Sequence, residues 1–215
     1  MCLTPARARD AVCSDHVIDL YDRHADDYDR DRSRSLQERA WLDEFLSHVR
    51  PAGTILDVGC GMGEPIARYV LEAGFRVVGI DSSPSLISRA RARFPDSEWL
   101  VADMRELSLH RRFDGLLAWD SFFHLPIGDQ RTMFPVFSAH AVRGAPLMFT
   151  SGSARGEAIG AYRGEPLYHA SLAPVEYAQL LASNGFSLLA YRAEDRECGG
   201  HTVWLARNDG EESEA

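Results

Sequence analysis

Apolar residues follow two different spacings along the chain, and these spacings predict its strands and helices. Nearly continuous apolar runs, typical of strands buried on both faces of a parallel sheet, occur at 54–58, 75–80, 97–101, 113–119 and 145–150. Segments with an apolar residue at every third or fourth position, typical of helices, occur at 64–73, 84–93, 128–142 and 174–184. Two last apolar runs, 186–191 and 201–206, surround a pair of glycines and predict a hairpin-like pair of strands.

Two further helices are expected before the first strand. The first begins near Ser14, and the second ends at the Pro-Ala-Gly sequence of residues 51–53. The apolar stripe of the first consists of Val17, Leu20, Tyr21, His24, Ala25 and Tyr28, and that of the second consists of Leu42, Phe45, Leu46 and Val49. We expect residues 1–13 to form a flexible leader and residues 208–215 an acidic tail.

This order of elements predicts one α/β domain. Strands that alternate with helices build a doubly wound parallel sheet, and the final hairpin adds an antiparallel strand at the C-terminal end. In such sheets the ligand crevice lies outside the carboxyl ends of the strands. The loops that follow the predicted strands are therefore the places to look for chemistry.

Composition excludes several classes of function. The chain has 215 residues, 45% of them hydrophobic, which is enough for one domain with a core of its own. Its net charge of -9 argues against general nucleic-acid binding. All 23 basic residues are arginines, so Schiff-base chemistry, pyridoxal phosphate attachment and a P-loop lysine are excluded.

The expected location of the protein also follows from the sequence. Cys2, Cys13, Cys60 and Cys198 have no paired spacing, which favours a reducing compartment over a disulfide framework or a zinc site. The N-terminus has no apolar segment typical of a signal peptide, and no run is long enough to span a membrane. We expect a cytoplasmic protein.

The loop after the first strand points to a cofactor that contains a nucleoside. The strand ends in Asp57 and three alternating glycines, 59, 61 and 63, and the next strand ends in Asp81. Glycines let a backbone approach a ligand closely, and a carboxylate at the end of the next strand can grip a pair of hydroxyls. An ordinary tight turn is the simpler alternative. A dinucleotide-binding loop is disfavoured, because it requires G-x-G-x-x-G and because Asp57 would lie awkwardly near a pyrophosphate.

Four segments resemble the class I S-adenosylmethionine-dependent methyltransferases. Residues 57–63 resemble their motif I, Asp81 resembles their ribose-binding acid, residues 102–104 resemble their adenine-binding motif, and residues 114–119 resemble their motif IV. The resemblance covers residues 54–150 well. It implies a seven-stranded, mostly parallel sheet with an antiparallel C-terminal strand. It also implies a helical cap at 14–50, a cofactor-binding core at 54–150, a substrate-side insertion at 151–173, and a C-terminal helix and hairpin at 174–207.

The resemblance implies how S-adenosylmethionine would be held. Gly59 and Gly61 would admit its methionine portion, Asp81 would accept hydrogen bonds from both ribose hydroxyls, and Asp103 would take the adenine amino group. The Met104 amide would serve a ring nitrogen, Ser82 would support Asp81, and Tyr28 or a nearby arginine would contact the methionine carboxylate. The expected cofactor-binding set also includes Asp57, Cys60 and Trp119.

Three segments are expected to carry the methyl acceptor. Asp120 and His124 follow the fourth strand and are the polar residues best placed near the methyl group, each against a simple structural role. The long loop 150–174 is interpreted as a substrate cap with His169 as a catalytic candidate and Arg163 as a partner for an anionic group. His201, before the last strand, is a weaker candidate for the same pocket.

We therefore expect methyl transfer to an oxygen or nitrogen of a small molecule, mainly by proximity and orientation, with S-adenosylhomocysteine as product. The N-P-P-Y type tetrapeptide of DNA and glutamine amino-methyltransferases is absent after the fourth strand. No metal site, nucleic-acid partner or membrane contact is expected, and the chain would be a monomer or homodimer. The alternatives are a methyltransferase for protein or RNA and a cofactor-binding regulatory protein without activity.

Overall fold

The computed structural model describes residues 16–210. The expected leader 1–13, the Ser14 start of the first helix and residues 211–215 of the expected tail lie outside the described residues. Asn208, at which we expected the tail to begin, is the last residue of a strand and is buried.

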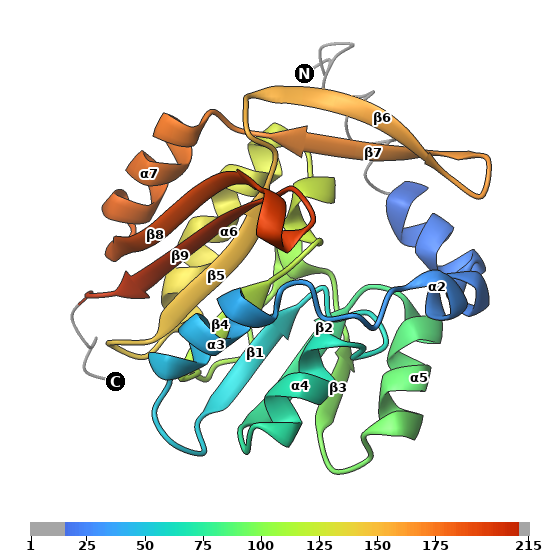
Figure 1. Cartoon of the computed structure of the whole chain (residues 1–215), viewed down its shortest axis with the longest axis horizontal. Coiled ribbons are helices and arrows are strands. Elements are labelled where there is room, and N and C mark those ends of the chain that lie inside the picture. Colours follow the sequence, from blue (N-terminus) through green and yellow to red (C-terminus); the bar gives the residue numbers. More distant parts are fainter. Residues whose placement is uncertain (1–15, 211–215) are drawn as a thin grey trace.

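A seven-stranded sheet forms the centre of the fold, in the order β3-β2-β1-β4-β5-β9-β8 (Figure 1). All neighbouring strands pair in parallel except β9, which is antiparallel to both β5 and β8. The predicted fold class is confirmed, including the antiparallel C-terminal strand. The strands are β1 (Thr54–Val58), β2 (Arg76–Asp81), β3 (Glu98–Val101), β4 (Gly115–Ala118), β5 (Pro146–Ser151), β8 (Phe186–Asp195) and β9 (His201–Asn208).

Helices cover both faces of this sheet (Figure 1). Leu42, Ile66 and Ile87 belong to one apolar core, and Phe134 and Leu181 belong to the core on the other face. Their helices are α3 (Arg39–Ser47), α4 (Ile66–Glu72) and α5 (Pro84–Arg93) on the first face, and α6 (Ile127–His140) and α7 (Pro174–Ser183) on the second. No helix between residues 16 and 210 is long and apolar enough to cross a membrane.

The register of the strands brings the expected site residues to one edge. Val58 pairs with Ile80, and Asp81 pairs with Val101, so β1, β2 and β3 end side by side. Because β9 runs antiparallel, it begins at the edge where the parallel strands end, and its Thr202 pairs with Ser151 of β5. The ends of the parallel strands and the beginning of β9 therefore meet at one edge of the sheet.

The expected cap loop 150–174 contains a β-hairpin, which the sequence analysis did not predict. Strands β6 (Gly156–Tyr162) and β7 (Glu165–Ser171) pair antiparallel through the two-residue turn Arg163–Gly164. Both turn residues have positive φ, 53° and 82°, as a type I′ hairpin turn requires. Nearly all of β6 is exposed, so it lacks the buried alternate face that makes a strand recognisable in a sequence.

The first predicted helix is divided into two. Residues 16–23 are helical, His24 forms a turn, and α2 (Ala25–Asp31) continues the chain. These helices lie beside the tip of the β6–β7 hairpin (Figure 1). Three short 3₁₀ turns complete the fold: η1 (Met104–Glu106), η2 (Phe122–His124) and η3 (Arg196–Cys198).

Candidate functional site

A cavity lies at the carboxyl edge of the sheet, under the N-terminal helices. Its empty volume is about 680 Å³ when the space open to solvent at its mouth is included. The loops after β1, β2, β3 and β4 form its floor. Its lining consists of Val17, Ile18, Tyr21, Tyr28, Gly59, Gly61, Asp81, Ser82, Leu86, Asp103, Met104, Asp120, Ser121, His124 and Leu125.

The loop after β1 offers bare backbone to this cavity. Gly59 has φ +77°, and a Cβ built on it would lie 2.3 Å from the Cβ of Ser121. Gly61 has φ +54°, and a Cβ there would lie 3.5 Å from the Tyr28 ring. Only glycine satisfies both the left-handed backbone and the close approach at residue 59.

Asp81 connects the loops after β1 and β2. Its two carboxylate oxygens accept hydrogen bonds from the Gly61 and Ser83 amides, each at 2.9 Å. Desolvation by burial raises the pKa of this carboxyl, and the two amide bonds oppose that shift. A carboxylate can accept about four hydrogen bonds, so roughly two acceptor positions remain for a ligand.

Asp103 and Met104 line the cavity beyond Asp81. Asp103 is the N-cap of η1, and both of its oxygens also bond the Arg105 guanidinium, the shortest of these contacts being 2.6 Å. Burial acts to raise the pKa of Asp103, but the Arg105 side chain and amide outweigh it and lower the pKa. A ligand amino group at this carboxylate would have to share it with Arg105.

Asp120 is held in place by contacts from three other parts of the chain. Its backbone has φ +49°, and its amide donates to Thr150 Oγ1 at 2.9 Å. Its carboxylate oxygens lie 3.3 Å from Arg32 Nη1 and 3.0 Å from His201 Nε2. Burial acts to raise the pKa of Asp120, but the bond to His201 and the nearby positive charges lower it. The carboxylate is therefore ionised and fixed at the rim of the cavity.

The contacts of His201 require a protonated ring. Nδ1 lies 2.7 Å from the Cys198 carbonyl oxygen, and Nε2 lies 3.0 Å from the Asp120 carboxylate. Both partners are acceptors, so both ring nitrogens must donate, which only the imidazolium can do. Consistently, the hydrogen bond to Asp120 raises the pKa of His201.

His124 has the opposite character. Its Nδ1 lies 2.8 Å from the Tyr168 carbonyl oxygen and must donate to it, and its Nε2 lies 3.2 Å from the Tyr21 hydroxyl. Desolvation by burial lowers the pKa of His124 to about 4, so the ring is neutral at pH 7. In this tautomer Nε2 carries a lone pair, and the Tyr21 hydroxyl donates to it.

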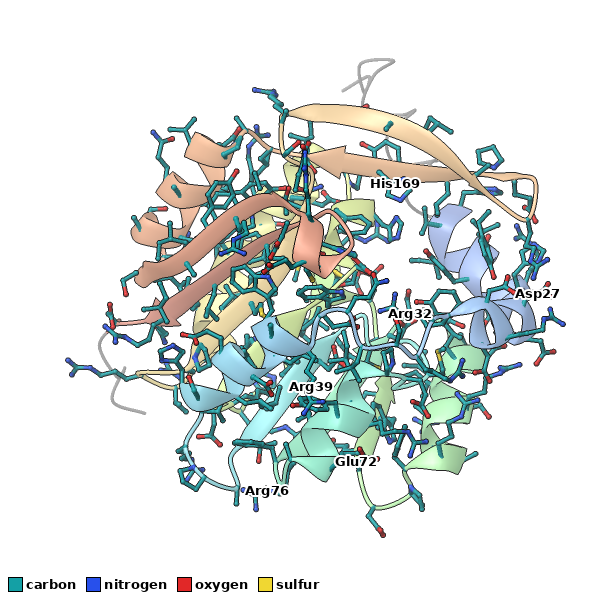
Figure 2. All side chains as sticks on the ribbon, viewed as in Figure 1. Asp27, Arg32, Arg39, Glu72, Arg76 and His169 are labelled. Atoms are coloured by element: carbon teal, nitrogen blue, oxygen red, sulfur yellow. The ribbon has the colours of Figure 1, made fainter. Side chains whose placement is uncertain are left out.

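His169 adjoins this histidine but lines a different cavity. The two rings lie 4.7 Å apart between centroids. His169 comes from β7, whereas Arg32, which contacts Asp120 at the main cavity, directly follows α2 (Figure 2). Together with Phe123 and Ser151, His169 lines a second cavity. The structure thus places His169 next to His124 but outside the lining of the main cavity.

Three residues of the expected cofactor set do not line the main cavity. Asp57 is buried, and desolvation, with a smaller contribution from Asp81, raises the pKa of its carboxyl to about 7. Cys60 is buried against the backbone of Gly79. The Trp119 ring is buried and packs on His201 at 5.3 Å. These three side chains are buried near the site and do not face the main cavity.

The sequence analysis missed several members of the site. Arg32 was not singled out, because the alternating charges of residues 29–34 give no sign of which arginine turns inward. Ser121 was also missed, although its hydroxyl donates to the Val58 carbonyl at 2.7 Å and fixes the loop after β4. The other missed members are Val17, Ile18, Leu86 and Leu125. Among residues 16–210, no group of three or more His, Cys, Asp or Glu side chains could hold a metal ion.

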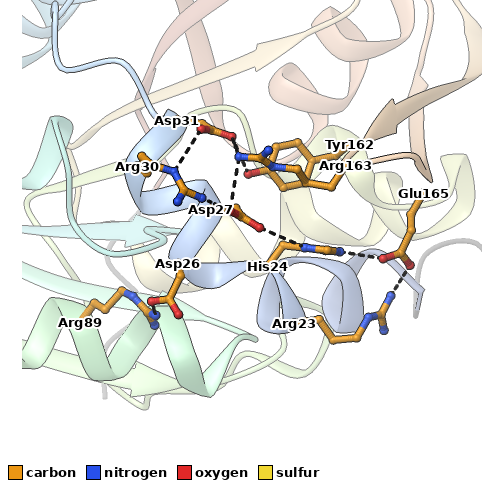
Figure 3. Close-up of polar contacts among 10 residues, drawn as sticks. All are labelled: Arg23, His24, Asp26, Asp27, Arg30, Asp31, Arg89, Tyr162, Arg163 and Glu165. Carbon is orange, nitrogen blue, oxygen red and sulfur yellow. Dashed lines mark hydrogen bonds and ion pairs between the residues drawn. The ribbon is translucent and has the colours of Figure 1, made fainter.

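Ion pairs join the hairpin to the N-terminal helices above the cavity (Figure 3). Arg163 Nη2 lies 2.5 Å from Asp31 and 3.4 Å from Asp27. Glu165 accepts hydrogen bonds from His24 at 2.7 Å and from Arg23 at 2.5 Å. We call these six residues, Arg23, His24, Asp27, Asp31, Arg163 and Glu165, the hairpin latch. Between them the Tyr162 ring stacks on Tyr21 at 6.2 Å, which connects the hairpin to the partner of His124.

Comparison with known proteins agrees with this architecture. The family model described as Methyltransferase domain matches residues 55–144. Trans-aconitate 2-methyltransferase of Azoarcus sp. (strain BH72) is 34% identical over 128 residues, which are 59% of this chain and 47% of that protein. The dTDP-3-amino-3,4,6-trideoxy-alpha-D-glucopyranose N,N-dimethyltransferase of Streptomyces venezuelae is 30% identical over 100 residues, 44% of this chain and 42% of that protein. The chain thus spans less than half the length of these curated relatives.

A solved structure extends the likeness to almost the whole chain. The 1,6-didemethyltoxoflavin-N1-methyltransferase of Burkholderia thailandensis, with bound 1,6-didemethyltoxoflavin and S-adenosylhomocysteine, has a TM-score of 0.70 and 20% sequence identity. The likeness covers 98% of this chain and 92% of that one. The family match covers residues 55–144, and the sheet has the strand topology that the resemblance to class I S-adenosylmethionine-dependent methyltransferases implied.

Proposed function

We propose that the protein binds S-adenosylmethionine in the main cavity and directs methyl transfer to an oxygen or nitrogen of a small molecule. One observation carries this proposal: a single cavity unites Gly59, Gly61 and Asp81 on one side with Asp120 and His124 on the other. The first group suits a nucleoside cofactor. The second supplies the polar groups that would face an acceptor.

The residues present fit the cofactor. Gly59 and Gly61 present backbone to the cavity, and the missing Cβ of Gly59 makes room for Ser121, which lines the same cavity. Asp81 has unused acceptor positions at the end of β2, where ribose hydroxyls can donate to a carboxylate. Tyr28 lines the same cavity beside Gly61 and is a candidate for the methionine carboxylate.

When bound, S-adenosylmethionine supplies a methyl carbon to the acceptor's lone pair, and the carbon–sulfur bond breaks with its electron pair left on sulfur. The chain holds the two reactants in position and excludes water from the site. Tyr21 and Tyr28 of the N-terminal helices border the cavity together with His124, and the hairpin latch joins these helices to the β6–β7 hairpin. Asp120, fixed by Arg32 and His201, keeps one orientation at the rim.

The relatives support a small acceptor. Their names specify trans-aconitate, an amino sugar nucleotide and a toxoflavin precursor, all of them small molecules. The cavity also lies between the N-terminal helices and the strand-end loops, since side chains of both line it. We therefore favour a small molecule over a protein or RNA acceptor.

Exchange of Asp81 tests the cofactor site. In Asp81→Asn we expect affinity for S-adenosylhomocysteine to fall about tenfold to a hundredfold, since a hydrogen bond to a charged group contributes about 1.5–3 kcal/mol. Isothermal titration calorimetry measures the change. Asp96→Asn is the matched control, because Asp96 is exposed outside the cavity. Unchanged affinity in Asp81→Asn would show that the cofactor binds elsewhere.

Turnover separates an enzyme from a regulatory cofactor-binding protein. We expect S-adenosylhomocysteine to form when the protein is incubated with labelled S-adenosylmethionine and a panel of small metabolites. Tight cofactor binding without product on any small molecule, protein or RNA fraction would favour the regulatory alternative.

A further inference from the structure

The hydrogen bonds of His124 define what kind of group it can meet. Nδ1 is committed to the Tyr168 carbonyl at 2.8 Å, so Nε2 is the ring atom available on the cavity side. In the free protein its lone pair accepts from the Tyr21 hydroxyl at 3.2 Å. An incoming ligand can replace that hydroxyl only with a donor of its own, an N–H or an O–H.

The charges around the cavity add a second constraint. The ionisable acids of its lining are Asp81, Asp103 and Asp120, and no arginine belongs to the lining within the described chain. The cations that contact these acids face carboxylates. Arg32 lies 3.3 Å and His201 3.0 Å from Asp120, and Arg105 lies 2.6 Å from Asp103. Arg163, which the sequence suggested as an anion partner, is engaged with Asp31 and Asp27 in the latch. A carboxylate acceptor would lose its hydration without gaining a cationic side chain.

The basicity of His124 distinguishes between the two remaining donors, an amine N–H and an alcohol O–H. The pKa of His124 is lowered to about 4 by burial, so its ring is a weak base. An alcohol must give up its proton to become a strong nucleophile, and a base works best when its pKa is near the working pH. An amine in its free-base form already carries the lone pair it needs. Its nitrogen also has an N–H for Nε2, and its surplus proton after methylation passes to bulk water.

We propose that the methyl acceptor is a primary or secondary amine on a small molecule without negative charge next to the nitrogen, and that its N–H bonds His124 Nε2 in place of Tyr21. This inference rests on the proposed function and specifies its substrate class. It selects the amine among the oxygen and nitrogen acceptors that the fold permits. His124 acts here as a hydrogen-bond acceptor that orients the nitrogen.

Nuclear magnetic resonance tests the tautomer without turnover. In protein labelled with ¹⁵N-histidine, we expect His124 at pH 7 to show a protonated Nδ1 and an unprotonated Nε2. The signals are assigned by their loss in His124→Asn. A protonated Nε2 would overturn the inference, because that nitrogen could not accept from an amine.

Matched acceptors test the substrate class. The panel contains 3-amino-3-deoxyglucose, glucose and glucuronate, and benzylamine, benzyl alcohol and benzoate. Within each set of three compounds, we expect the amine to be methylated at least tenfold faster than its hydroxyl and carboxylate counterparts. Mass spectrometric fragmentation should place the new methyl group on nitrogen. Faster methylation of an alcohol or a carboxylate would overturn the amine inference and leave the proposed function standing. Absence of product from every member, despite bound cofactor, would count against both. Failure to bind S-adenosylhomocysteine would refute the proposed function and, with it, the inference that rests on it.

Discussion

At Gly59 the loop after β1 closely approaches the loop after β4. The backbone has φ +77°, and a Cβ at this position would lie 2.3 Å from Ser121. We expect Gly59→Ala to lower the free energy of unfolding by about 2–4 kcal/mol, from the left-handed conformation and the overpacking together. Urea denaturation measures the loss. Gly144→Ala is the matched control, because Gly144 has φ +84° with nothing within 4 Å of its added Cβ.

The control separates two causes of instability. Gly144→Ala should cost about 1–2 kcal/mol, which is the conformational part alone. Equal losses in the two variants would mean that the loops after β1 and β4 yield freely to a side chain at residue 59. In that case the close approach would not constrain the cavity.

The pair of Asp120 and His201 predicts a dependence of stability on pH. The folded-state pKa of His201 is raised, mainly by its bond to Asp120, so the pair contributes fully below the ordinary pKa of about 6.5. Its contribution is lost as the pH rises through the raised pKa of His201. At the acid end it is lost as the pH falls through the lowered pKa of Asp120.

We therefore expect His201→Gln to cost about 1 kcal/mol near pH 5 to 6 and progressively less above neutral pH. Denaturation of both proteins across this range gives the difference. A cost that stays constant with pH would mean that His201 stabilises the fold by packing on Trp119 and that its charge contributes nothing.

At the level of elements, charge holds the hairpin to the N-terminal helices. In Arg163→Gln we expect amides near the hairpin tip to exchange hydrogen up to about fivefold faster, since exposed ion pairs contribute about 0.2–1 kcal/mol. High salt should have the same effect on the unmodified protein. Arg155→Gln, an exposed change near the base of the same hairpin, is the control. Equal exchange in all three proteins would show that stacking of Tyr162 on Tyr21 suffices to hold the hairpin.

The sequence predicted the elements of the main sheet but missed this hairpin, for a physical reason. Strands β1, β4 and β5 are buried on both faces, so their residues form continuous apolar runs. Strand β6 is exposed along nearly its whole length, and its pattern has no buried face. The turn Arg163–Gly164 also lacks the Asn-Gly or Asp-Gly pair that usually indicates a two-residue hairpin.

The molecule as a whole should respond to its proposed cofactor. S-adenosylhomocysteine at about 100 times its dissociation constant would stabilise the folded state by about 2.7 kcal/mol, which corresponds to a rise in Tm of about 5–10 °C. Differential scanning fluorimetry measures this shift. NADH should produce none, because the loop after β1 lacks the dinucleotide spacing. A larger shift with NADH would reverse the choice of cofactor.

The site was predictable where it follows a strand and unpredictable where it depends on folding. Gly59, Asp81 and Asp103 each follow a recognisable apolar run, and the structure brings them to one cavity. Arg32 and Tyr21 come from helices packed over the sheet, and a sequence does not show which side chain of a helix reaches the cavity. The roles of the predicted residues toward a ligand remain predictions.

The contacts that Arg32 and His201 make with Asp120 also bear on how the protein is synthesised. Arg32 lies near the beginning of the chain, and His201 comes from its last strand. A ribosome that has synthesised β1 to β5 has already produced every strand end that lines the cavity, yet Asp120 then has only one of its two cationic partners. The contacts of Asp120 can therefore assume their final form only after translation has passed residue 201.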